Sequence, residues 1–145
     1  MNKILSFFRL SPALKCMAAE AFFLSLFYRL QIKCRPFPAL ARHWGTPGLE
    51  TSREAVHPKI AADISWAVGA VCRRTPWHSS CLVQALTARK MLIRRGLSCT
   101  LYMGARRDEA GHALAHAWLR SGKKFITGGD GSLLYAVTSV YGTKM

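Results

Sequence analysis

The hydrophobic pattern of the chain changes its period once, at Gly96. Before it, apolar residues such as Ile60 and Ile64 recur three or four positions apart, which is the spacing of a helix face. After it, apolar and polar residues alternate over 99–103, which is typical of a strand. Helices followed by strands predict an α+β fold, in which an antiparallel sheet packs on the helices.

Proline and glycine residues mark where the expected elements begin and end. Pro12 suits the first turn of the first helix, and Gly96 suits the stop of the last one. The expected helices cover residues 12–33, 39–43, 58–74 and 81–95. The expected strands cover residues 99–103, 112–120, 124–127 and 134–141, with turns at 106–111 and 121–123.

The chain is expected to divide near residue 50. Residues 1–50 form a helical segment for packing or partner contact, and residues 51–145 form a compact α+β half. Residues 45–51 carry Gly, Pro and Thr and are expected to form a loop that links the two parts flexibly.

The first helix lies in a strongly apolar stretch, residues 4–32. Lys15, Glu20 and Arg29 interrupt this stretch, so we do not expect it to span a membrane. No small-residue cleavage site of a signal peptide is evident. We predict a heavily buried helix with thin polar stripes that packs on the core or on a partner, with peripheral membrane contact as the alternative.

The charge of the chain is strongly positive. Its 145 residues include 21 Lys and Arg but only 7 Asp and Glu, a formal net charge of +14. Such a surface attracts acidic partners, which include nucleic acid, an anionic membrane, an acidic peptide and an acidic protein. The basic residues are spread over helices and turns without a recognisable nucleic-acid motif, so nucleic acid is the weaker alternative.

Five cysteines are scattered along the chain, at positions 16, 34, 72, 81 and 99. An odd, scattered set makes a poor disulfide framework. The sequence has no CxxC pair and no close Cys/His set, so we expect no structural zinc. These features favour a reducing, cytoplasmic setting.

Cys81 is the cysteine best placed for chemistry. It follows Ser79 and Ser80, either of which can cap the third helix, so its thiol lies in the first turn. Free N–H groups and the positive end of the helix dipole favour the nucleophilic thiolate there. The same N–H groups can stabilise an oxyanion. The alternative interpretation is a small buried hydrophobe, as most free cysteines are.

A general base is expected on the strands. His116 lies in the middle of the expected strand 112–120, on one face with Trp118. His112 shares that face but lies beside a turn, and His78 is close to Cys81 but lies in a loop, where it could line the site. The alternative for His116 is a hydrogen-bonded core residue without a catalytic role.

The group that orients His116 should lie on the following strand. With a three-residue turn at 121–123, His116 faces Gly128, and Asp130 is the diagonal neighbour on the same face. With a two-residue turn the parity reverses and Asp130 points away. Asp130 is therefore a conditional candidate for the third site residue.

Four short stretches resemble the transglutaminase-like leader peptidases of lasso-peptide biosynthesis. These are residues 81–86 (CLVQAL), 94–96 (RRG), 102–106 (YMGAR) and 115–119 (AHAWL). The resemblance covers nearly the whole chain and is strongest from Trp77 to Gly129. Its specificity lies in the order and spacing of the stretches.

The resemblance implies a transglutaminase/papain-like cysteine protease fold, with 51–145 as the catalytic domain. Cys81 is then the nucleophile and His116 the base and acid. The family's acidic residue lies about a dozen positions beyond its histidine, which here is Gly128, and the nearest carboxylate is Asp130. A backbone carbonyl or a side-chain amide is the alternative group that could orient the ring. The expected substrate-binding residues are Trp77, His78 and Trp118, and no metal or organic cofactor is implied.

The resemblance also implies a substrate and partners. The enzyme would remove the leader from a ribosomally made lasso-peptide precursor. A chain of this length has no room for a fused leader-recognition domain, so a separate recognition protein is expected, and the lasso cyclase is a further candidate partner. Two alternatives remain open: acyl transfer to an amine, and a basic non-enzymatic module that binds nucleic acid.

Overall fold

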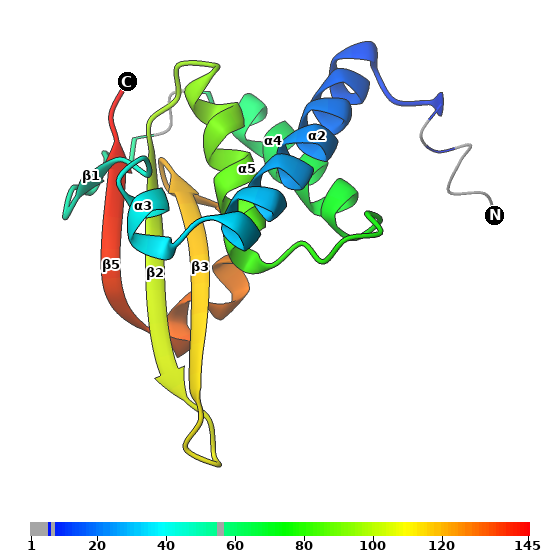
Figure 1. Cartoon of the computed structure of the whole chain (residues 1–145). Coiled ribbons are helices and arrows are strands. Elements are labelled where there is room, and N and C mark those ends of the chain that lie inside the picture. Colours follow the sequence, from blue (N-terminus) through cyan, green and yellow to red (C-terminus); the bar gives the residue numbers. More distant parts are fainter. Residues whose placement is uncertain (1–5, 7, 55–56) are drawn as a thin grey trace.

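The computed structural model describes residues 6, 8–54 and 57–145. They build an antiparallel sheet with helices α4 (Pro58–Cys72) and α5 (Cys81–Ile93) packed on one face. The long helix α2 (Pro12–Cys34) contacts α4 and α5 and forms an outer layer beyond them (Figure 1). This is the predicted α+β architecture.

The strands of the described sheet lie in the order β1-β5-β2-β3-β4, and every neighbouring pair is antiparallel. Their bounds are β1 Thr46–Pro47, β2 Cys99–Arg107, β3 Ala113–Ser121, β4 Lys124–Thr127 and β5 Ala136–Thr143. The long β2–β3 hairpin projects beyond the rest of the sheet (Figure 1). A short 3₁₀ helix, η1 (Gly129–Leu134), connects β4 to β5.

Proline and serine residues start the helices as the sequence predicts. Ser11 accepts a hydrogen bond from the backbone N–H of Leu14, and Pro12 occupies the first position of α2. Pro58 opens α4 in the same way, and Ser80 caps α5. The short helix α3 (Phe37–Ala41) begins two residues before its predicted start at residue 39.

The core lies between the helices and the sheet. The small residues Ala85 and Ala88 on α5 are fully buried, so the helix approaches β3 closely. Ala117 and Leu119 on β3 belong to the same core cluster, and so do Leu40 and Trp44 from before residue 50. Described residues from before position 50 therefore share one core with the rest of the described chain.

The opposite face of the sheet is held by Arg120, of which only 1% is exposed. Its guanidinium donates to the hydroxyl of Tyr102 (3.0 Å) and to the carbonyls of Gly122 (2.6 Å) and Thr51 (2.9 Å). These bonds tie the segment after β1 to β3. Residues 46–47, expected in a flexible loop, form strand β1 and pair with β5.

The prediction that α2 is heavily buried is wrong. Its buried residues are Ala18, Ala21 and Ser25, whereas Phe23 is 68% exposed and Phe27 50% exposed. The helix contacts the rest of the protein along one side only, because it packs as an outer layer on α4 and α5. Within the described part of the chain, no helix is both long enough and apolar enough to cross a bilayer.

Candidate functional site

Cys81 is the first residue of α5. Ser80 is the N-cap, and its hydroxyl accepts from the backbone N–H of Val83 (3.3 Å). The carbonyl of Ser80 accepts from the N–H of Gln84 (3.0 Å), so the N–H groups of Cys81 and Leu82 remain at the helix end. Cys81 is half-buried and packs against the edge of the core. The predicted position of this thiol, in the first turn behind a serine cap, is confirmed.

His116 lies on β3 opposite Gly104 of β2. Its Nε2 atom is 2.8 Å from the carbonyl oxygen of Gly128, the residue that follows β4. The imidazole also lies against two aromatic rings, those of Tyr135 (centroids 5.0 Å apart) and Trp118 (5.7 Å). The ring is therefore held both by a hydrogen bond and by packing.

The partner of Nε2 determines the tautomer of His116. A carbonyl oxygen only accepts hydrogen bonds, so in the neutral ring Nε2 carries the proton. Nδ1 is then the unprotonated nitrogen, and it has no hydrogen-bond partner among residues 6, 8–54 and 57–145. A ring in this state can accept a proton at Nδ1 while it remains bonded to Gly128.

Cys81 and His116, both in the described part of the chain, share no hydrogen bond. Ala117 and Leu119 face the core that α5 covers, and side chains alternate along a strand. His116 therefore lies on the other face of β3, with Trp118 and Arg120. The structure therefore does not join the candidate nucleophile to the candidate base.

The β3–β4 hairpin combines both of the predicted geometries. Its turn has two residues, Gly122 and Lys123, because Ser121 pairs with Lys124. After this turn Arg120 pairs with Phe125, but a register shift puts Leu119 opposite Thr127. Beyond the shift, the side chains of β4 face the same way as they would after a three-residue turn. Gly128 nevertheless ends the strand, since its φ of 67° is left-handed.

Asp130 lies beyond the end of β4, in η1, and its side chain is exposed. Its carboxylate accepts from the backbone N–H of Gly131 at 3.1 Å. The structure does not bring this carboxylate to His116, whose Nε2 is bonded to Gly128 instead. The group bonded to the imidazole is the backbone oxygen of Gly128 and not a carboxylate.

The family model described as the transglutaminase-like superfamily matches residues 15–140. The chain belongs to the transglutaminase-like superfamily. This superfamily includes cysteine proteases and acyltransferases. Comparison with curated proteins gives no match, and neither does comparison with solved structures.

The three residues expected to bind substrate lie in different surroundings in this transglutaminase-like domain. Trp77 precedes α5, and its ring packs on Phe22 of α2 (centroids 5.0 Å apart). Its indole N–H is buried without a partner in the described structure. His78 is exposed, and Trp118 is buried and stacks on Tyr102 (5.5 Å, 9° between planes).

The sequence places Gly128 opposite His116 and leaves a backbone carbonyl open as its partner, but it does not indicate Tyr135 or Gly131. Gly128 contributes a backbone oxygen, Tyr135 contributes a ring, and Gly131 leaves room, since a methyl group there would lie 3.0 Å from Nε2. A pattern of side-chain types does not predict which ring packs on the imidazole or where a glycine must leave space for it. The signal that was available is the offset of a dozen residues from His116 to Gly128.

The other cysteines differ from Cys81 in their surroundings, and all five are free. Cys16 and Cys34 are exposed on α2. Burial raises the pKa of the Cys99 thiol to about 11, against a smaller opposing effect of the Arg89 charge. Burial also raises the pKa of Cys72, although its hydrogen bond to Ser79 acts in the other direction. The raised pKa favours the neutral form of both thiols, which is a poor nucleophile.

A metal site would need several ligands close together. Across the described ranges 8–54 and 57–145, no three His, Cys, Asp or Glu residues are grouped so that they could hold an ion.

Proposed function

We propose that this transglutaminase-like domain is a cysteine endopeptidase that removes the leader from a lasso-peptide precursor. The observation that carries the proposal is the placement of Cys81 at the first position of α5, behind the Ser80 cap. A thiolate at the positive end of a helix is the nucleophile that cysteine proteases use. The stretches around Cys81 and His116 resemble the lasso leader peptidases, which gives the substrate class.

The proposed reaction begins with attack of the Cys81 sulfur on the carbonyl carbon of the scissile peptide bond. Nδ1 of His116 takes the thiol proton and returns it to the leaving amine, which becomes the N-terminus of the core peptide. The leader stays on Cys81 as a thioester. Water, deprotonated by His116, then hydrolyses the thioester and releases the leader as a carboxylic acid.

The oxyanion of each tetrahedral intermediate needs hydrogen-bond donors. Ser80 satisfies the N–H groups of Val83 and Gln84, so those of Cys81 and Leu82 are the nearest donors at the helix end. Donors fixed before the reaction stabilise developing charge without reorganisation. In this proposal the first turn of α5 both activates the sulfur and binds the oxyanion.

The mechanism requires Sγ of Cys81 and Nδ1 of His116 to come within hydrogen-bond distance when substrate binds. Catalytic hydrogen bonds are often long before the substrate complex forms. Because His116 lies on the face of β3 opposite α5, this approach requires a rearrangement of the β3 edge beside it, which η1 covers instead of a strand.

The partners of the proposed peptidase follow from charge and resemblance. A net charge of +14 suits an acidic leader or an acidic partner surface. In the resembling family a separate recognition protein presents the leader, and a cyclase closes the freed core. We propose the same arrangement here, in the cytoplasm.

Transfer of the leader to an amine is the second candidate, because acyltransferases of the same superfamily pass through the same thioester. Incubation of the precursor and the recognition protein with the enzyme in ¹⁸O-water, with and without hydroxylamine, separates the two. We expect a free core and a leader acid carrying ¹⁸O. Acyl transfer would be supported if the leader is recovered only as the hydroxamate when hydroxylamine is present, and if no leader acid forms when hydroxylamine is left out. An intact precursor under both conditions would contradict both functions.

A further inference from the structure

One side of α2 is apolar and faces away from the protein. Angular positions at 100° per residue place six residues within one sector of about 80°. This set, called here the outer face of α2, comprises Cys16, Ala19, Phe23, Phe27, Leu30 and Cys34. All six are exposed, with Phe23 at 68%, Phe27 at 50% and Leu30 at 52%. From Cys16 to Cys34 the face is about 27 Å long, and it contains no charged residue.

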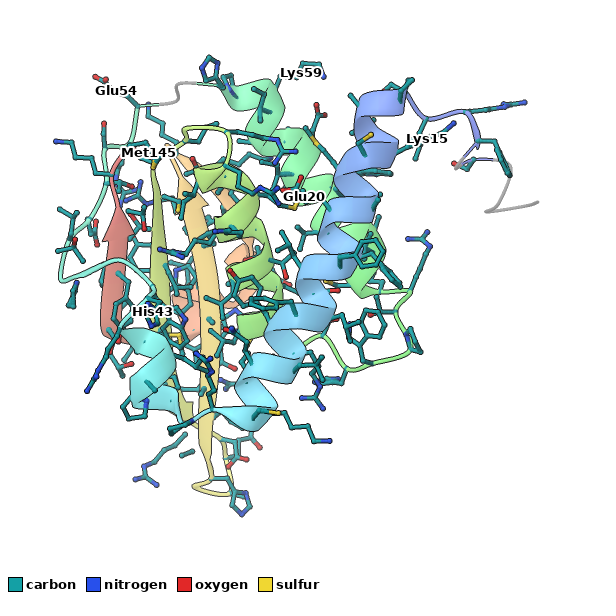
Figure 2. The ribbon with its side chains drawn as sticks, turned by 45° about the horizontal axis from the view of Figure 1, so that its top comes forward. Lys15, Glu20, His43, Glu54, Lys59 and Met145 are labelled. Carbon is teal, nitrogen blue, oxygen red and sulfur yellow. The ribbon has the colours of Figure 1, made fainter. Side chains whose placement is uncertain are left out.

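Basic side chains border the outer face of α2. Lys15, Arg29 and Lys33 follow one flank, within a sector of about 40°. Figure 2 shows Lys15 near the N-terminal end of α2, pointing away from the sheet.

The opposite flank carries the only carboxylate of α2, a helix that the structure describes in full. This is Glu20, which lies toward α5 and is paired with Arg94 (3.3 Å) and Arg95 (2.7 Å) (Figure 2). Because Arg94 remains 58% exposed, positive charge borders the outer face on both sides.

Exposed phenylalanines also lie beyond both ends of the helix in the sequence. Phe8 before α2 is 69% exposed, and Phe37 after it is 49% exposed. Contiguous apolar patches of this length are rare on monomeric proteins and mark interaction sites. The patch is also convex, since α2 is an outer layer on α4 and α5.

We infer that the outer face of α2 binds the surface of a lipid bilayer that contains anionic headgroups. A convex helix with Phe and Leu along its ridge and Lys and Arg on its flanks matches the helices that lie in the membrane interface. The phenylalanines enter the acyl boundary while the flanking cations meet lipid phosphates. Docking of a second copy on the same face is opposed by the net charge of +14 on each chain.

Sedimentation with vesicles tests this inference, which goes beyond the proposed peptidase activity. The full chain is mixed with phosphatidylcholine vesicles containing 30% phosphatidylglycerol and with pure phosphatidylcholine vesicles. We expect at least tenfold stronger binding to the anionic vesicles, with weaker binding at high salt. Phe23→Ser/Phe27→Ser should lose at least tenfold in binding, and Arg29→Gln/Lys33→Gln should lose binding to anionic vesicles.

A matched control uses exposed apolar residues elsewhere. Leu133 is 97% exposed on η1, and Leu133→Ser/Leu134→Ser should bind vesicles like the unchanged protein. An environment-sensitive fluorophore on Cys34, in a chain with Cys16→Ser and Cys81→Ser, should shift to shorter wavelength with anionic vesicles. The inference is overturned if the full chain does not sediment with anionic vesicles, or if Phe23→Ser/Phe27→Ser binds them normally. It is equally overturned if the phenylalanines instead support a dimer in sedimentation velocity.

Discussion

The carbonyl oxygen of Gly128 lies 2.8 Å from Nε2 of His116. A backbone acceptor therefore stands where a Cys-His-Asp site would carry an acidic side chain. It fixes the tautomer of the ring but brings no negative charge to stabilise the imidazolium. A methyl group at Gly128 would lie 2.6 Å from the carbonyl oxygen of Ala117, so the backbone at this position has no room for a side chain.

Gly131→Ala tests whether the position of the imidazole matters. The added methyl group would lie 3.0 Å from Nε2 and 3.3 Å from Cδ2 of His116, so the ring must move. We expect kcat/KM for leader cleavage to fall by about 10- to 100-fold, toward the value of His116→Ala. The matched control is Gly69→Ala, whose methyl group meets only the flexible end of Arg73. Equal activity of the two variants would remove His116 from the mechanism.

Asp130→Asn tests the carboxylate predicted as the third member of the site. Its carboxylate is exposed and accepts from the N–H of Gly131, a bond that the amide oxygen of Asn can replace. We expect kcat/KM to stay within about threefold of the unchanged enzyme, since the hydrogen bond to Gly128 persists. A loss of 100-fold or more, with an unchanged unfolding midpoint, would return Asp130 to the catalytic machinery.

Arg120→Met tests the hydrogen bonds that Arg120 makes on the face of the sheet opposite α4 and α5. The change leaves the buried carbonyls of Thr51 and Gly122 without their donor. We expect the free energy of unfolding to fall by about 3–5 kcal/mol in urea titrations. Arg94→Met, on a side chain that is 58% exposed, should cost about 1 kcal/mol or less. Similar losses for the two variants would contradict the role assigned to Arg120.

The Cys99 thiol should make the free energy of unfolding decrease at alkaline pH. Burial raises its pKa to about 11 from an ordinary value of 9.0, so the folded state favours the neutral thiol. The neutral thiol contributes fully to the free energy of unfolding below pH 9. As the pH rises through about 11, this contribution is lost, and the free energy of unfolding falls by about 2–3 kcal/mol. Urea unfolding between pH 8 and 11 should show less pH dependence in Cys99→Ala than in Cys16→Ala, whose thiol is exposed. Identical pH dependence would rule out this linkage.

Much of the fold could be predicted because local rules agree with one another. Pro12 and Pro58 open their helices, Ser80 caps α5, and β4 has the predicted bounds 124–127. Alternation over β2 predicts which side chains face the core. These features depend on neighbours within a few residues, which a sequence displays directly.

The surroundings of His116 could not be predicted in the same way. The register shift after Leu119 depends on how β3 and β4 meet, and Gly128 acts through its backbone. The exposed side of α2 was missed because an apolar stretch does not say how much of its circumference is covered. Three-dimensional packing decides that, and here α4 and α5 cover one side only.

In the proposed peptidase, Cys81 carries the leader as a thioester during cleavage. Precursor and recognition protein are incubated with the enzyme, quenched in acid and read by intact-protein mass spectrometry. We predict a free core peptide together with an enzyme adduct of leader mass less one water, located at Cys81. Cys81→Ala should give neither product, while Cys16→Ala behaves like the unchanged enzyme. Release of the core by Cys81→Ala at the unchanged rate would contradict the account.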